Sequence, residues 1–81
     1  MISSEQIKAL IADGLHCETL RIEGDNQHFE ALIVSDFFSG KSRVKRQQAV
    51  NALLRPYFDK GELHAFSMKS LTPEEWSALR G

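Results

Sequence analysis

The segment from Glu62 to Trp76 constrains the fold most strongly, because it is typical of a short strand that runs directly into a sharply started helix. Thr72 is a helix-capping residue, Pro73 suits the first helical position because its missing N–H has no intrahelical partner there, and Glu75 stands where a capping-box acid belongs. His64 stands at the beginning of the predicted strand. A histidine at the rim of a sheet is held rigidly and is reached from outside, as a metal ligand must be.

Length and composition indicate a single small domain over residues 1–81. The chain has 81 residues, 42% of them hydrophobic, which suffices for one modest core. A single cysteine rules out an internal disulfide and a cysteine-only metal site within one chain. No apolar run approaches a membrane span, and the N-terminus lacks a signal-peptide pattern. We therefore expect a cytoplasmic protein without membrane contact.

The charge is unevenly placed along a chain whose net charge is only −1. Residues 1–40 carry two basic and seven acidic side chains, whereas residues 41–60 carry six basic and one acidic. A dedicated nucleic-acid-binding protein more often has a clear basic excess overall. The basic segment nevertheless suits either an acidic protein surface or a nucleic-acid backbone.

Apolar periodicity predicts a helix followed by a hairpin in the first half of the chain. The helix begins at a serine cap and ends at Gly14, where glycine accepts a left-handed conformation. Strands over residues 19–23 and 28–34 are joined by a turn at 24–27, and the second is central because both its faces are apolar. Residues 35–40 form a loop.

The second half of the chain is predicted to contain two helices and a third strand before the last helix. Ser42 caps a helix over residues 43–51, and Pro56 interrupts it, so that a second short helix ends before Gly61. A strand over residues 63–68 then returns parallel to the central strand. The fold class is α+β, in the order α-β-β-α-α-β-α with a three-stranded mixed sheet.

Three groups of side chains are candidates for chemistry: two histidines, the single cysteine, and a cluster of basic residues. Taken alone, His64 is most often a residue that hydrogen-bonds backbone, His28 a solvated loop residue, and Cys17 a small packing residue. The third group is the basic cluster Lys41, Arg43, Lys45 and Arg46, whose charges wrap around a helix and so disfavour sequence-specific DNA reading. No nucleophile–base motif or phosphate-binding loop is present, so we do not expect an enzyme.

The order of these motifs resembles the BolA family, and within it the IbaG-like branch. The resemblance rests on Phe38-Ser-Gly-Lys41, the basic helix that follows, the His64-Ala strand and Thr72-Pro-Glu-Glu-Trp76, and it covers nearly the whole chain. It implies a BolA-like fold similar to class II KH domains. Because no Gly-x-x-Gly loop is present, RNA binding does not follow from that likeness.

The resemblance also implies a metal site that is completed by a partner. In this family the histidine that matches His64 is a ligand of a [2Fe–2S] cluster shared with a monothiol glutaredoxin, whose cysteine and a glutathione supply thiolates. His28 is the best candidate for a second ligand, with Cys17 and His16 as alternatives. Alone, the protein is expected to be a monomer or a weak homodimer.

The basic cluster and Phe38 are expected to form the surface that contacts the partner. Phe37 and Phe38 are each either core or contact residues. The alternative partner is DNA, since the two predicted helices resemble a helix-turn-helix; Gln47, where many family members have histidine, argues against it. A stress-response or envelope-related interaction module without metal or nucleic acid is the third interpretation.

Overall fold

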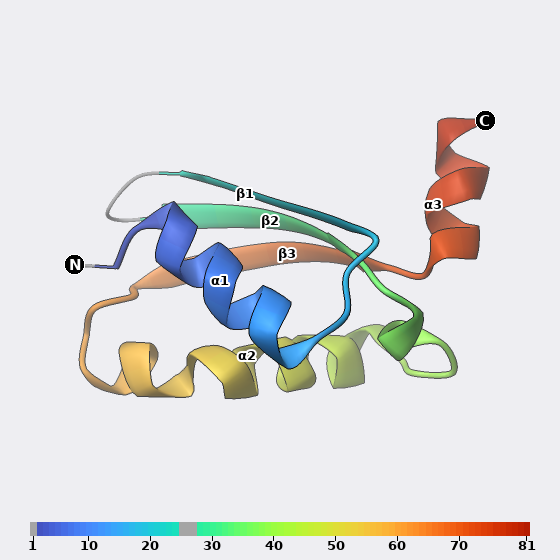
Figure 1. Ribbon diagram of the computed structural model, residues 1–81. Coiled ribbons are helices and arrows are strands. Elements are labelled where there is room, and N and C mark those ends of the chain that lie inside the picture. Colours follow the sequence, from blue (N-terminus) through green and yellow to red (C-terminus); the bar gives the residue numbers. More distant parts are fainter. Residues whose placement is uncertain (1, 25–27) are drawn as a thin grey trace.

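The computed structural model of the protein describes residues 2–24 and 28–81 (Figure 1). The elements follow one another as α1 (Ser4–Gly14), β1 (Thr19–Gly24), β2 (His28–Val34), the 3-10 turn η1 (Asp36–Phe38), α2 (Arg43–Asp59), β3 (Ala65–Leu71) and α3 (Pro73–Arg80). The predicted turn at residues 24–27 falls largely on residues 25–27, which lie outside the described residues. Among the described residues, no helix is both long and apolar enough to cross a membrane.

The three strands form one mixed sheet in the order β1-β2-β3. β1 pairs antiparallel with β2, and β3 pairs parallel with β2 from His28 opposite Ala65 to Val34 opposite Leu71. The predicted α+β class, the central position of β2 and the parallel return are therefore confirmed. The predicted bounds of the third strand were too early, because Leu63 is buried and its N–H donates to Tyr57 O at the end of α2 instead of joining the sheet.

Helix α2 is one continuous helix of 17 residues, so the predicted break into two helices is wrong. An interior proline removes one backbone hydrogen bond and costs about 3 kcal/mol. Pro56, however, lies in the last turn and is exposed. Val50 and Leu54 are fully buried and hold the middle of the helix against the core. Residues 43–59 consequently contain no turn that could make them a helix-turn-helix.

Helices α1 and α2 pack side by side on one face of the sheet, and the opposite face carries no helix over most of its length (Figure 1). Gly14 ends α1 as predicted, but it does not adopt a left-handed conformation. A Cβ there would lie 2.5 Å from Leu53 Cδ2 of α2, so glycine permits the two helices to approach. The core between helices and sheet consists of Ile2, Ile7, Ile11, Leu15, Phe29, Ala31, Ile33, Phe38, Val50, Leu54 and Leu63.

Helix α3 projects from the end of the sheet (Figure 1). No residue of α3 is buried, and Leu79 is 62% exposed. Its start is fixed by polar contacts: Thr72 caps it and forms the predicted capping box with Glu75. Helix α3 is therefore held at its first turn and free of the core beyond it.

Candidate functional site

The two predicted metal-ligating histidines lie together at one end of the sheet. His28 is the first residue of β2 and pairs with Ala65, so His64, which immediately precedes β3, lies beside it. Adjacent strands are about 4.8 Å apart. Both histidines are exposed, and His28 Nε2 lies 3.5 Å from Ser67 Oγ. The structure thus brings together two residues that are 36 positions apart in the sequence.

His28 and His64 are the candidate metal ligands at this end of the sheet. Within residues 2–24 and 28–81, no group of three or more histidine, cysteine, aspartate or glutamate side chains is arranged to hold a metal ion. Both imidazoles are exposed at the starts of neighbouring strands, where a partner has access to them, and neutral imidazole is a good donor to iron. The chemistry of these two side chains therefore fits iron, and two ligands leave a four-coordinate centre to be completed by other donors.

The alternative second ligands lie at the other end of the sheet. His16 and Cys17 precede β1, whose first residue pairs with Val34 at the end of β2, and Ser35 Oγ donates to His16 O at 2.6 Å. The length of β2 places this loop about 20 Å from His28. Burial raises the pKa of the Cys17 thiol, which lies 3.5 Å from Leu15 O. Neither residue can share a centre with His64 of the same chain.

The basic cluster also lies far from the two histidines, because α2 starts beside the end of β3. Arg46 links the two elements: its Nη1–H donates to Ser70 O at 2.9 Å and its Nε–H donates to Lys41 O at 2.9 Å. A helix of 17 residues is about 25 Å long. The basic cluster and the two histidines therefore lie at opposite ends of the sheet.

Arg46 has a structural role and was wrongly assigned to a contact surface. Its side chain is only 11% exposed and forms a salt bridge with Glu75 Oε1 at 2.7 Å. This hydrogen bond, together with a backbone hydrogen bond at Thr72, lowers the pKa of Glu75 to about 2. Arg46 therefore fastens the first turn of α3 to α2 and β3. No local sequence signal distinguishes it from Arg43 and Lys45, which are exposed.

Phe38 is fully buried, so its predicted place on a contact surface is wrong as well. The turn η1 directs it into the core and leaves Phe37 43% exposed. The two rings meet edge to face, 6.1 Å apart. Lys41 Nζ lies 4.0 Å from the Phe37 ring centre and donates to Phe37 O at 2.8 Å. The exposed aromatic residue beside the basic cluster is consequently Phe37.

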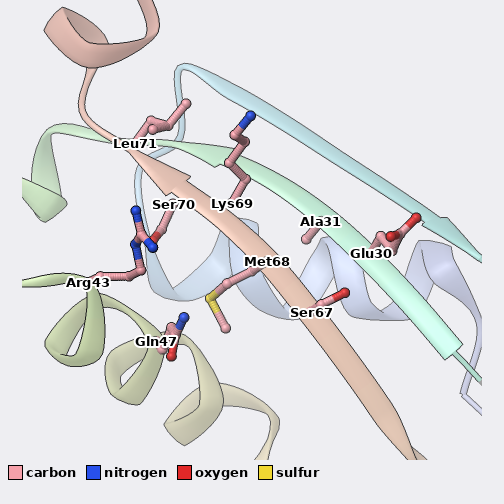
Figure 2. Close-up of a pocket in the computed structure, with 9 residues that line it drawn as sticks. All are labelled: Glu30, Ala31, Arg43, Gln47, Ser67, Met68, Lys69, Ser70 and Leu71. Carbon is pink, nitrogen blue, oxygen red and sulfur yellow. The ribbon is translucent and has the colours of Figure 1, made fainter.

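A groove that the sequence did not reveal runs between α2 and β3 (Figure 2). Its volume is about 470 Å³. Arg43 and Gln47 line it from α2, and the remaining lining residues come from β2 and β3: Glu30, Ala31, Ser67, Met68, Lys69, Ser70 and Leu71. The groove could not be predicted because it depends on how far α2 lies from the strand edge.

Comparisons with known proteins agree on one family. The family profile described as BolA-like protein matches residues 5–75. The acid stress protein IbaG of Escherichia coli is 34% identical over 79 residues, which cover 98% of this chain and 94% of that protein. The crystal structure of a Bol-like protein from Babesia bovis matches with a TM-score of 0.88 and 33% identity, covering 100% of this chain and 96% of that one. BolA1 from Arabidopsis thaliana matches with a TM-score of 0.81 and 35% identity, covering 93% and 98%.

Proposed function

The chain belongs to the BolA-like protein family, and from this premise we propose that it is an adaptor that binds a monothiol glutaredoxin and shares a glutathione-containing [2Fe–2S] cluster with it. The resemblance to IbaG inferred from the sequence is confirmed by the comparison. The observation that carries the proposal is the placement of His28 and His64 at the starts of two neighbouring strands.

His64 and His28 would each donate a ring nitrogen, and the glutaredoxin cysteine and glutathione would supply the thiolates. The bound cluster would provide electron transfer or sulfide and iron for delivery, and histidine ligation raises the reduction potential of such clusters. Since both histidines stand outside the core, they are accessible to a partner without any rearrangement of the sheet.

The adaptor would take the place of one subunit of a glutaredoxin homodimer. Its histidines would then replace one cysteine thiolate and one glutathione as ligands of the cluster. Imidazole in place of thiolate changes both the charge of the ligand set and the strength of the iron bond. We therefore expect a heterodimer with altered cluster transfer, acting in iron–sulfur trafficking or in iron and redox sensing in the cytoplasm.

Anaerobic reconstitution with a monothiol glutaredoxin, iron, sulfide and glutathione tests this function. Size and visible circular dichroism should reveal a heterodimer whose cluster spectrum differs from that of the glutaredoxin homodimer. His64→Ala should alter the spectrum and shorten the cluster lifetime, and His28→Ala should do the same if it is the second ligand.

His16→Ala is the matched control, because it removes an exposed histidine from the opposite end of the sheet. This variant should leave the spectrum and lifetime unchanged. The proposal fails if the two proteins remain separate while the cluster stays on the glutaredoxin homodimer. If His64→Ala behaves as His16→Ala does, His64 is not a ligand of the cluster.

A second candidate function is binding of a nucleic-acid backbone. Arg43 and Lys45 are exposed, and residues 37–58 contain no acidic side chain. Duplex affinity should then fall steeply with salt, by a slope of about 0.9 per phosphate contact. Charge reversal at Arg43 and Lys45 should abolish duplex binding. Binding that survives this double reversal would exclude the basic helix as the contact.

A further inference from the structure

The outer edge of β3 carries backbone groups that no neighbouring strand uses. In the described chain β3 has a strand on one side only. Ser35 N–H donates to Leu71 O at 2.9 Å, so the Leu71 carbonyl points toward β2. Because successive residues of a strand alternate, Phe66, Met68 and Ser70 direct their N–H and C=O groups to the outer edge. The bond from Arg46 Nη1 of α2 to Ser70 O agrees with this assignment.

The groove beside this edge has an apolar floor and a basic wall. Figure 2 shows the Met68 side chain entering the space between β3 and α2, with Arg43 and Gln47 rising from α2 toward the strand. Glu30 is the acidic residue among the described lining residues, and it lies near Ser67, away from Arg43. The two positive charges of Arg43 and Lys69 exceed this one negative charge.

The charge around Arg43 is not balanced within α2. No aspartate or glutamate occurs from residue 37 to residue 58. Arg43 is also the first residue of α2, where the helix dipole adds positive potential. An occupant of the groove is therefore expected to be acidic, and to be extended if it uses the open edge.

We propose that an acidic, extended peptide segment of a partner protein adds to the outer edge of β3 as a fourth strand, with acidic side chains beside Arg43. Backbone pairing would supply affinity and the groove would supply selectivity, as in other cases of strand addition. The edge offers both donors and carbonyl acceptors at Phe66 and Met68. A DNA backbone has no donors for those carbonyls, so a peptide fits better than DNA.

The basic wall of this surface is distant from the proposed cluster site, since Arg43 lies at the opposite end of the sheet from His64, whereas the open edge begins at Phe66, two residues after His64. The two proposals are therefore tested through different side chains. His64→Ala should leave peptide affinity unchanged, and Arg43→Glu should leave the cluster spectrum unchanged, so failure of either proposal is recognised separately.

The probe is a blocked seven-residue peptide of alternating glutamate and valine, titrated into the full chain and followed by amide NMR. We expect the amide signals of Phe66 and Met68 to shift and their hydrogen exchange to slow. The same peptide with N-methylated interior amides keeps its charge but loses its donors, and should bind more than about tenfold more weakly. A lysine–valine peptide should not bind.

Arg43→Glu tests the basic wall and should weaken peptide binding about tenfold. Glutamate is favourable in the first turn of a helix, so the fold is retained. Arg55→Glu is the matched control on the same helix outside the groove, and should leave affinity unchanged. Equal affinity for the N-methylated peptide, or equal loss in both variants, would overturn the proposal. An Arg43-dependent affinity for duplex DNA without peptide binding would overturn it in favour of nucleic acid.

Discussion

Replacing Arg46 with methionine tests whether this side chain fastens α3 to the body of the protein. Methionine retains most of the apolar length of the arginine side chain but removes the guanidinium group. The change therefore deletes the hydrogen bonds to Lys41 O, Ser70 O and Glu75 without opening a large cavity.

The expected loss of stability follows from the two backbone carbonyls to which Arg46 donates hydrogen bonds. Each N–H···O distance is 2.9 Å, and the side chain is 11% exposed, so water replaces these bonds incompletely. A hydrogen bond to a charged group contributes about 1.5 kcal/mol or more, so we expect Arg46→Met to lower the free energy of unfolding by about 2–3 kcal/mol. For a domain of this size the melting temperature should fall by roughly 10–20 °C. The salt bridge to Glu75 is not counted in this free energy, because that carboxylate is exposed and the solvent screens its charge.

Urea unfolding followed by far-ultraviolet circular dichroism measures the global loss, and Trp76 fluorescence reports on α3 directly. Hydrogen exchange should accelerate more in the amides of α3 than in those of β2, because the variant removes the contact to Glu75 of α3, whereas β2 keeps its pairing with both neighbouring strands.

Lys45→Met is the matched control, since Lys45 is the exposed neighbour of Arg46 on the same helix. It should change the free energy of unfolding by no more than about 0.5 kcal/mol. If both variants unfold at the same urea concentration, Arg46 is an ordinary surface residue, and the structural assignment is refuted.

Three further predictions concern other contacts. Because the hydrogen bond from Arg46 lowers the pKa of Glu75 to about 2 from an ordinary 4.5, the ionised carboxylate stabilises the folded state above pH 4.5 and loses this effect as the pH falls toward 2. Glu75→Gln should therefore be less stable than the parent at pH 7 and equally stable near pH 2, and a stability difference that does not depend on pH would contradict this reasoning. Gly14→Ala should destabilise by about 1 kcal/mol in urea unfolding despite the better helix propensity of alanine, because its Cβ meets Leu53, and Leu53→Ala should remove that penalty. Native Cys17 should react with iodoacetamide severalfold more slowly than the urea-unfolded chain, as followed by mass spectrometry, because burial raises its thiol pKa; equal rates would disprove the burial.

The strands and helix starts could be predicted because their signals are local. The alternation through residues 28–34 and the Thr72–Glu75 capping box describe contacts within a few residues of each other, and the structure contains both. The predicted helix break at Pro56 was wrong because it, too, was inferred from a local signal. The proline rule is also local, whereas burial of Val50 and Leu54 by the sheet and α1 is tertiary.

The candidate site was predictable only in part. The proximity of His28 to His64, which precedes its strand partner Ala65, follows once the parallel sheet is correct. The roles of Arg46 and Phe38 were missed because exposure is a property of three-dimensional packing. A cluster of four basic residues within six positions, or a pair of adjacent phenylalanines, contains no information on which member faces inward.

The parallel pairing of β2 with β3 has a consequence for evolutionary change. Residues at the beginnings of these two strands meet in space, yet neither His28 nor His64 belongs to the buried core. Either position can accept a different side chain without altering the packing that determines the fold. A lineage with this scaffold can therefore change the chemistry of this end of the sheet by single substitutions while the core remains as it is.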